Sequence, residues 1–416
     1  MGFKKYIKRQ VEQRIKQLFE SFPLIFLTGP RQSGKTTLLK HLFPDFNYFN
    51  LETPATLSRA KEDPLGFLSP SKIILDEAQK APWLFSYLLE LVDKEKKQVV
   101  IAGSQNLLLH QKISQSLAGR VALVELFPFT LSEIKEWLPD DIETIILKGG
   151  YPRVYQIKEK NIFDWYQGYL HTYLERDVRH LKNIKDLLVF QDFIQLLAGQ
   201  AGGLLNLNSI SNNLGISATT LRQWLSVLEA SYLVFRLRPY FANIRKRLTK
   251  RPKIYFYDTG LLATILAIKN KQELKNHPLY GQIFENFIVA EIIKTFSHFN
   301  FPRKIYFLRD KTGNEIDLLW PHYGQKLSAL EIKTSATFNP NFIKKIEYFR
   351  QFLPLDRGFV VYKGEAFTFK GIRIIPWSGL ADQSLILSLV QSPLGADHPH
   401  LETESSLREN QSRLSE

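Results

Sequence analysis

The stretch from Leu24 to Thr37 contains the residues of this chain best suited to bind a phosphate. An apolar run ends in Gly29-Pro-Arg-Gln-Ser-Gly-Lys-Thr36, which has the form G-x-x-x-x-G-K-T, and a helix-forming segment follows. Strand, glycine-rich loop and helix in that order are the context that a phosphate-binding loop requires. The two glycines let the backbone approach a phosphate, and the amides of the loop and the helix N-terminus supply donors. The sequence therefore predicts a site for a nucleoside triphosphate.

Within that loop, Lys35 would reach the β- and γ-phosphates, and the Thr36 hydroxyl would ligate Mg²⁺. Pro30 has no backbone N–H, so the cradle depends on the residues from Arg31 onward. The alternative is a glycine turn that matches the pattern by chance. The flanking strand and helix make this alternative the weaker interpretation. The predicted nucleotide contacts in the loop are Gly29, Arg31, Gln32, Ser33, Gly34, Lys35, Thr36 and Thr37.

Two further strand ends carry polar residues that would complete the site. Lys72-Ile-Ile-Leu-Asp76-Glu77 ends in two carboxylates, of which Asp76 would hold Mg²⁺ and Glu77 would activate the attacking water. An isolated acidic pair is more often a helix cap or a solvated turn, but its place after a phosphate loop favours the catalytic roles. Ser104 and Gln105 follow another apolar strand, where ring-type ATPases place a sensor of the γ-phosphate; a helix N-cap is the alternative.

A second group of charged residues lies in two strand-like runs near the C-terminus, joined by a turn at Tyr323-Gly324. Alternation along a strand puts Glu331 and Lys333 on one face, with Asp317 of the neighbouring strand beside Glu331. Two carboxylates that bind Mg²⁺ and a lysine that activates water are the groups of metal-assisted phosphodiester cleavage. Glu285, in a helical run, would be a further metal ligand. A salt-bridged strand pair is the alternative.

The elements that must position these groups follow from the hydrophobic pattern. Residues 21–150 alternate strand and helix signals, which predicts an α/β fold with a parallel sheet and helices on both faces. Before it, residues 1–20 suggest an amphipathic helix that packs on this domain. After it, we expect a helical lid and winged helix-turn-helix region at 151–270, a nuclease-like α/β domain at 275–390 and a disordered tail at 391–416.

The region from residue 207 to residue 257 has the outline of a winged helix. A short helix at 207–214 and the turn Gly215-Ile216 precede a longer helix, Ala218–Ser231, which Ser217 would cap. The loop before the returning strand is strongly basic from Arg245 to Lys253 and would meet a phosphate backbone. The alternative is that the winged helix contacts another protein or forms the lid of the ATPase. In the longer helix Leu221, Trp224, Leu225 and Leu228 form one apolar face, opposite Thr219, Arg222, Gln223 and Ser226.

Composition narrows the class of protein. The 416 residues suggest about three domains. The net charge is +14, which favours a polyanionic partner, nucleic acid first. The absence of cysteine excludes disulfides, thiolate zinc sites and a cysteine nucleophile. No apolar stretch reaches the ~18 residues of a membrane span, and the N-terminus lacks the apolar core of a signal peptide, so we expect a cytoplasmic protein.

These motifs together resemble a prokaryotic family of AAA-like P-loop ATPases with a C-terminal domain of restriction-endonuclease type. The resemblance implies ATP rather than GTP, ATP hydrolysis and a requirement for Mg²⁺. It also implies an arginine finger, for which Arg120 is the best placed and Arg153 and Arg176 are alternatives. The chain departs from some related nucleases at Lys344-x-x-x-Tyr348, where they place a glutamine. The resemblance covers about residues 25–335, through Gly29–Thr37, Leu75–Gln79, Ala102–Gln105, Leu117–Val121, Gly149–Arg153, Leu174–Asp177, Tyr257–Leu261, Gly281–Val289, Glu315–Asp317 and Leu330–Thr334.

The leading hypothesis is therefore an ATPase that acts on DNA, in which the nucleotide state controls a winged helix and a nuclease centre. The alternative from another class is a nucleotide-gated regulatory protein whose nuclease-like domain is a non-catalytic scaffold. A third and weaker hypothesis is a structural DNA binder that holds ATP without turnover. Besides DNA, a second copy of the chain is the other partner that the sequence suggests.

Overall fold

The computed structural model describes residues 6–390, apart from residues 95–96, 105–118, 179–183, 185, 242–248, 303 and 323–325. The predictions for Gln105, for Arg245, Lys246 and Arg247 of the basic loop, for the turn at residues 323–325 and for the tail at 391–416 lie outside the described residues, as does the side chain of Arg176.

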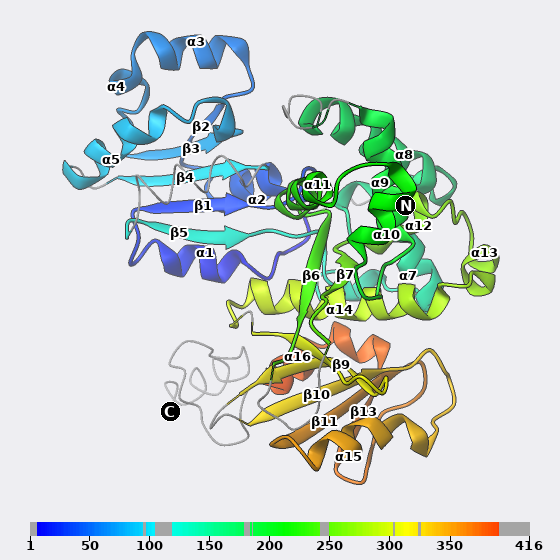
Figure 1. Cartoon of the computed structure of the whole chain (residues 1–416). Helices are drawn as coiled ribbons and strands as arrows, with labels where there is room; N and C mark the ends of the chain where they lie inside the picture. The colour runs from blue at the N-terminus through cyan, green and yellow to red at the C-terminus, as the bar shows by residue number, and fades with distance from the viewer. Residues whose placement is uncertain are drawn as a thin grey trace, which may run out of the picture.

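The predicted parallel sheet is confirmed. Five parallel strands stand in the order β2-β3-β4-β1-β5, in which β1 precedes the phosphate loop (Figure 1). Ile25 and Leu27 of β1 pack on one face with α2, while Leu24 and Phe26 pack on the other face with α5. The alternation of a strand thus buries both faces. The elements are β1 (Leu24–Thr28), α2 (Lys35–Leu42), β2 (Asn47–Asn50), α3 (Pro54–Glu62), α4 (Pro64–Phe67), β3 (Lys72–Asp76), α5 (Leu84–Lys94), β4 (Gln98–Gly103) and β5 (Val121–Glu125).

The N-terminal helix is shorter than the sequence predicts. Helix α1 spans Glu12–Leu18, and Val11 and Ile15 pack against the sheet as expected for an amphipathic helix. The backbone before it is not helical, because the amides of Arg9 and Gln10 donate to side chains rather than to helical carbonyls. The acceptors are Glu12 Oε1 at 2.5 Å and Glu133 Oε1 at 2.8 Å.

The middle of the chain is mostly helical. Its helices are α7 (Ile142–Lys148), α8 (Ile162–Tyr173), α9 (Leu187–Ala198), α10 (Leu207–Leu214), α11 (Ala218–Ala230), α12 (Thr259–Ile265) and α13 (Lys271–Asn276). Helices α10 and α11 occupy the positions predicted for the helix-turn-helix, and Gly215, with φ of 66°, makes the turn between them. Ser217 Oγ accepts from Thr220 N at 3.1 Å, so Ser217 is the predicted N-cap.

Strands β6 (Val234–Pro239) and β7 (Lys253–Phe256) follow α11 as an antiparallel pair. They do not form a separate hairpin, because β6 also pairs in parallel with β8. The result is an eight-stranded sheet, β12-β13-β11-β10-β9-β8-β6-β7, that runs from the C-terminal domain into the middle region. Its other elements are β8 (Tyr306–Arg309), β9 (Glu315–Pro321), β10 (Leu327–Ile332), α15 (Lys344–Arg350), β11 (Leu355–Tyr362), β12 (Phe367–Phe369), β13 (Ile372–Pro376) and α16 (Gln383–Val390).

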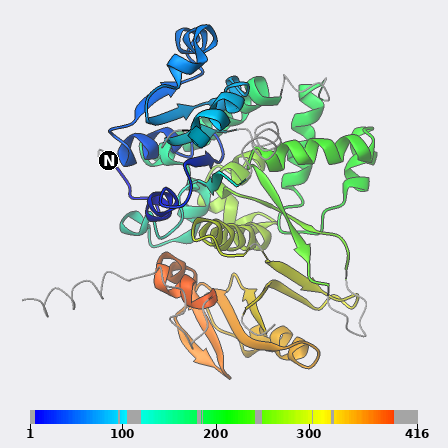
Figure 2. The same cartoon turned by 90° about the vertical axis from the view of Figure 1, so that its left-hand side faces the viewer.

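Helix α14 (Tyr280–His298) lies between the upper and lower halves of the molecule (Figures 1 and 2). Its residues from Ile283 to His298 are buried on nearly every side, with the ATPase and the helical region on one side and the C-terminal sheet on the other. A helix without a solvent face must satisfy its polar side chains within the protein. Helix α14 therefore determines how the three parts meet.

Among the described residues, no helix combines the length and the hydropathy needed to cross a bilayer.

Candidate functional site

The phosphate loop has the backbone shape of an anion cradle. Gly29 and Gly34 have φ of 146° and 95°, and Gln32 between them is also left-handed at 59°. A Cβ at Gly29 would lie 2.1 Å from the carbonyl oxygen of Leu126, so the residue must be glycine. Successive amides in such alternating conformations point into one concavity. Lys35 Nζ lies across the loop and donates to the carbonyl oxygens of Gly29 at 3.0 Å and Pro30 at 2.7 Å.

The predicted metal ligands meet at the carboxyl edge of the sheet. Thr36 Oγ1, at the start of α2, donates to Asp76 Oδ2 at 2.6 Å, at the end of β3. Tyr48 Oη donates to the same oxygen at 2.7 Å; the sequence had not singled out this residue. A hydroxyl and a carboxylate in contact form an oxygen donor set suited to Mg²⁺.

Glu77 and Ser104 are linked through a residue without an assigned role in the sequence analysis. Gln79 Nε2 donates to Glu77 Oε2 and lies 3.5 Å from Ser104 Oγ. Glu77 itself has a left-handed backbone, with φ of 54°, which turns it out of β3 toward the loop. Gln79 therefore holds the predicted base beside the predicted sensor.

A cavity of about 510 Å³ opens over the loop. One side is formed by loop and α2 residues together with Glu77, and the other by α8 and the segment before it. Its volume is within the range of small-molecule sites. The predicted contacts Gly29 and Ser33 support the cradle without lining the cavity. The lining residues are Arg31, Gln32, Gly34, Lys35, Thr36, Thr37, Glu77, Pro152, Arg153, Gln156, Tyr169, Thr172 and Tyr173.

The structure separates the predicted arginines. Arg120 immediately precedes β5, and its carbonyl oxygen accepts from Leu24 N, at the amino end of β1. The loop follows Thr28 at the other end of that strand, so roughly 13 Å of strand separates the two. Arg120 is therefore not among the residues that line the chain's own cavity, and its role as an arginine finger stays a prediction. Arg153, the alternative, is among the residues that line the cavity.

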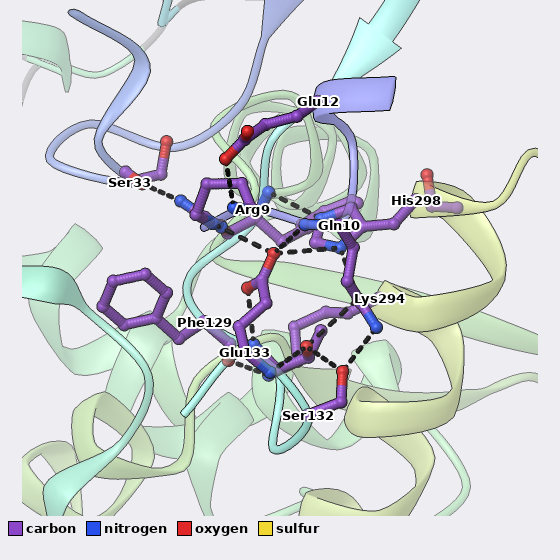
Figure 3. Close-up of polar contacts among 12 residues, drawn as sticks. Arg9, Gln10, Glu12, Ser33, Phe129, Ser132, Glu133, Lys294 and His298 are labelled. Carbon is purple, nitrogen blue, oxygen red and sulfur yellow. Dashed lines mark hydrogen bonds and ion pairs between the residues drawn. The ribbon is translucent and has the colours of Figure 1, made fainter. Parts of the chain in front are cut away.

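Sequence reasoning missed Arg9, which supports the loop from behind (Figure 3). Its side chain is 3% exposed, and Nη1 donates to the carbonyl oxygen of Ser33 at 2.9 Å. Nη2 donates to Phe127 O at 2.6 Å, and Nε donates to Glu133 Oε1 at 3.0 Å. In a trans peptide the N–H points opposite to the C=O, so the contact with Ser33 O directs the Gly34 amide toward the other side.

Arg9 lies in a polar network in which Arg9, Glu133 and His298 are buried and Gln10 and Ser132 are partly buried (Figure 3). Burial alone would raise the pKa of Glu133, but the charge of Arg9 lowers it, so the carboxylate stays ionised. Burial lowers the pKa of His298 to about 3, so this imidazole is neutral and can accept from Phe127 N. The network thus connects the N-terminal segment and the segment after β5 to α14. No short sequence motif marks it, because its members are more than 100 residues apart.

The C-terminal charged residues meet beside α14. Glu285 of α14 and Glu315 and Asp317 of β9 each place a carboxylate oxygen within 4.8 Å of the others. We name these three residues the acidic trio. Glu315 is a member that the sequence analysis did not select. Lys253 Nζ lies 2.8 Å from Glu285 Oε1 and also pairs with Glu315.

Lys253 corrects part of the predicted basic wing. Its side chain is 3% exposed and faces the acidic trio, so it does not present its charge to a phosphate backbone. The reason is that Lys253 is the first residue of β7, which pairs with β6 inside the large sheet. The described residues Lys250 and Arg251 remain exposed in that segment.

Asp317 and Glu331 lie on neighbouring antiparallel strands, as predicted. Asp317 Oδ2 accepts from Ile332 N at 2.7 Å, and Lys333 Nζ donates to Glu331 Oε2 at 2.5 Å. Burial, and then the charge of Asp317, raise the pKa of Glu331 to about 8. Glu331 Oε1 is buried without a hydrogen-bond partner among the described residues. Such an orphaned oxygen is the kind of group that a cation would satisfy.

Comparison with known proteins assigns the chain to a family. Residues 21–135 match the model of an AAA domain. Residues 139–272 and 280–380 match two further models, each described as a domain of unknown function (DUF8612 and DUF4143). A Walker-type ATPase of Pyrococcus abyssi has a similar structure, with a TM-score of 0.44 and 15% identity over 63% of this chain and 96% of that chain.

Curated relatives extend beyond the AAA domain. An uncharacterized protein of Methanocaldococcus jannaschii is 23% identical over 90% of this chain and 87% of its own length. Uncharacterized protein Rv2008c of Mycobacterium tuberculosis is 32% identical over 365 residues, which are 86% of this chain and 80% of that protein. The chain therefore belongs to the same family as the Mycobacterium tuberculosis protein, and its residues 21–135 form an AAA-type P-loop ATPase domain.

Proposed function

We propose that this protein binds and hydrolyses ATP with Mg²⁺ and couples the state of the nucleotide to DNA bound by α10 and α11. The ATPase proposal depends mainly on the contact of Thr36 Oγ1 with Asp76 Oδ2 at 2.6 Å. Thr36 lines the cavity together with Lys35 and Glu77. This contact supports the proposal because it joins the loop to the end of β3, where Asp76 and Glu77 are the candidate metal ligand and base.

Each residue has a distinct part in the proposed hydrolysis. Thr36 and Asp76 would hold Mg²⁺, which when bound neutralises charge on the β- and γ-phosphates. Lys35 would exchange its two loop carbonyls for phosphate oxygens. Glu77, held by Gln79, would take a proton from the attacking water, and Ser104 would report the presence of the γ-phosphate.

The two arginines would act from different copies of the chain. Arg153 lines the cavity of its own chain and supplies positive charge opposite the loop. Arg120 stands at the far edge of the sheet and could contribute only to the site of a neighbouring copy, as an arginine finger in trans does. This assignment requires a homo-oligomer during turnover.

The proposal for DNA depends on the outer face of α11. Leu221, Trp224 and Leu228 are buried, while Arg222 and Gln223 on the opposite side are exposed and able to meet phosphates or base edges. The net charge of +14 favours a polyanion. Contact with another protein is the alternative use of the same face.

A second candidate function, Mg²⁺-dependent phosphodiester cleavage, is favoured by the orphaned Glu331 Oε1 beside Asp317. The acidic trio, which includes Asp317, offers carboxylate oxygens, and these suit Mg²⁺. Asp317 and Glu331 would hold the ion with Glu285, the ion would activate water at the phosphodiester, and Lys333 would neutralise charge on the phosphate. The alternative is a scaffold that uses the same fold without cleavage.

The ATPase assignment is tested by two substitutions in the cavity. We expect Lys35→Ala to weaken ATP binding by at least about tenfold, because a charged donor to the phosphates is lost. We expect Glu77→Gln to bind ATP as the wild type does but to hydrolyse it roughly 10²- to 10⁴-fold more slowly. Binding of a fluorescent ATP analogue and release of phosphate measure the two effects. Wild-type turnover in Glu77→Gln would remove Glu77 as the base.

The support of the loop by Arg9 leads to a separate prediction. Arg9→Met should weaken ATP binding by about tenfold, or about 1.4 kcal/mol, because the Ser33–Gly34 peptide is no longer held. Arg14→Met is the matched control, since Arg14 contacts Ser297 O and Asn300 rather than the loop. Titration with ATP compares the variants, and Arg9→Lys should recover part of the affinity. Equal affinities for Arg9→Met and Arg14→Met would contradict the prediction.

The DNA proposal is tested on α11. The double substitution Arg222→Ala and Gln223→Ala should lower affinity for duplex DNA by about tenfold and reduce the salt dependence of binding by about one counterion. Arg373→Ala removes an exposed arginine on β13 and is the control for charge alone. Fluorescence anisotropy at several salt concentrations provides the measurement, repeated with ATP. If the α11 variant binds like the control, α11 does not contact DNA.

Cleavage is tested with supercoiled plasmid at millimolar Mn²⁺ or Mg²⁺, in the presence of ATP. We expect slow nicking by the wild type and a loss of at least about 10²-fold in Lys333→Ala, which removes the phosphate-facing charge. Lys345→Ala is the control, because Lys345 binds Asn314 and not the carboxylates. Identical behaviour of wild type and Asp317→Ala on every DNA form would favour the scaffold.

A further inference from the structure

Lys253 is a cation buried within a group of carboxylates that come from other parts of the chain. It begins β7, whereas Glu285 comes from α14 and Glu315 and Asp317 come from β9. Nζ lies 2.8 Å from Glu285 Oε1 and pairs with Glu315, and Tyr255 Oη donates to the same Glu285 oxygen at 2.6 Å. The lysine therefore points into the acidic trio and not toward solvent.

The acidic trio needs a cation at this position. Buried carboxylates within 4.8 Å of one another repel, and a buried charge is costly unless it is paired. Burial raises the pKa of Glu285 to about 7 even with Lys253 beside it. Arg309 also pairs with Glu315, at 3.0 Å, but its side chain is 40% exposed. Among the ion pairs of the described residues, Lys253 is the buried cation that joins two members of the trio.

The ammonium itself stays charged. Burial on its own would lower the pKa of Lys253, but the negative charges of Glu285, Asp317 and Glu315 raise it above its ordinary value. Nζ is 2.8 Å from Glu285 Oε1, and Mg²⁺ bonds a carboxylate oxygen at about 2.1 Å, so an ion on that oxygen would be no more than about 5 Å from Nζ. Two cations at that separation repel each other strongly where water does not screen them, and the Lys253 side chain is only 3% exposed. Lys333, which lies beside Glu331, is 31% exposed, so solvent weakens its repulsion of an ion.

We propose that Lys253 is a built-in cation that fills the metal position of the acidic trio, so that the lysine and a divalent ion exclude each other. This inference rests on the second candidate function, in which these carboxylates bind Mg²⁺. Glu331, with its orphaned Oε1, completes the set on the neighbouring strand. While Lys253 occupies this position, the nuclease-like centre does not bind a divalent ion and is inactive.

Lys253 belongs to a strand that is connected to the proposed DNA-binding region. Strand β7 pairs with β6, and β6 closely follows α11, the helix proposed to contact DNA. A shift of α11 with its two strands would withdraw Lys253 and open the acidic trio to a divalent ion. The DNA-facing region would thus control metal access in the C-terminal domain through one side chain.

The experiment uses the full chain with Lys253→Met, and Mn²⁺ as the probe. We expect Lys253→Met to melt at a lower temperature than the wild type, and millimolar Mn²⁺ to raise that temperature by roughly 4 °C or more, because the ion replaces the lost charge. The wild type should shift much less. Calorimetric or spin-resonance titration should show Mn²⁺ binding at least about tenfold tighter in Lys253→Met, and Asp317→Asn added to it should remove the gain.

Lys363→Met is the matched control. Lys363 is also largely buried and pairs with a single carboxylate, Glu143, at 2.7 Å, away from the trio. Its loss should lower the melting temperature without any recovery in Mn²⁺. If Lys253→Met does not fold, Lys253→Gln replaces it, because glutamine keeps hydrogen bonding without the charge. We expect the same recovery of the melting temperature by Mn²⁺ in that variant.

The outcomes separate the inference from the function on which it rests. If the wild type binds Mn²⁺ as tightly as Lys253→Met, and Asp317→Asn abolishes binding in both, the metal centre stands but Lys253 does not exclude the ion. If neither protein binds Mn²⁺, the metal centre and the inference both fail. Equal recovery of Lys363→Met and Lys253→Met by Mn²⁺ would show a non-specific effect and also overturn the inference.

Discussion

Helix α14 has no solvent face along most of its length, and this constraint organises the protein. Its charged side chains need partners in other elements, because an unpaired buried charge is costly. Glu285 meets Lys253 of β7, and Glu291 accepts from Leu131 N. Ser297 Oγ donates to Glu125 at 2.7 Å. One helix thus contacts the ATPase domain and the middle region through specific pairs, and a rearrangement of either part must break some of them.

The phosphate loop shares in this arrangement through its own strand. Tyr232, with a left-handed backbone at φ of 58°, lies between α11 and β6 and places its hydroxyl 3.2 Å from Glu125 Oε1 and 3.4 Å from Thr28 Oγ1. Thr28 is the last residue before the loop, and Glu125 also holds Ser297 of α14. The end of β1, the helix-turn-helix region and α14 therefore share one buried set of hydrogen bonds. A change in loop conformation would therefore disturb the hydrogen bonds that link β1 to Tyr232 and to α14.

Arg9 and Glu133 illustrate why buried ion pairs appear here at all. Such a pair adds little net stability, because removing two charges from water costs about as much as their attraction returns. Its value lies in position: the planar guanidinium satisfies Ser33 O, Phe127 O and Glu133 at once, a set of contacts that an apolar side chain could not make. We regard Lys253 in the same way: it offsets the charge of the carboxylates around it, and its position among them is what would exclude a divalent ion.

Features encoded in contiguous residues were predictable from the sequence. The glycines of the phosphate loop and Ser217 before α11 act within a few residues of their own position, so their spacing alone indicates their geometry. The end of β3 at Asp76 was also predictable, but its contact with Thr36, 40 residues away, depends on the order of the strands. The alternation of strands and helices likewise predicts the parallel sheet. The reason is that turns, caps and strand ends depend on local backbone conformation.

Contacts between distant residues could not be read in this way. Arg9 is 124 residues from Glu133, and Lys253 is 32 residues from Glu285, with no motif to join them. Arg120 precedes β5 at the amino end of the sheet, away from the loop, whereas the segment Pro152–Tyr155 brings Arg153 to the cavity. Burial turned Lys253 from an apparent wing residue into a partner of the acidic trio. These outcomes depend on which surfaces meet when the sheets and α14 pack together, and a linear pattern of residue types does not specify that.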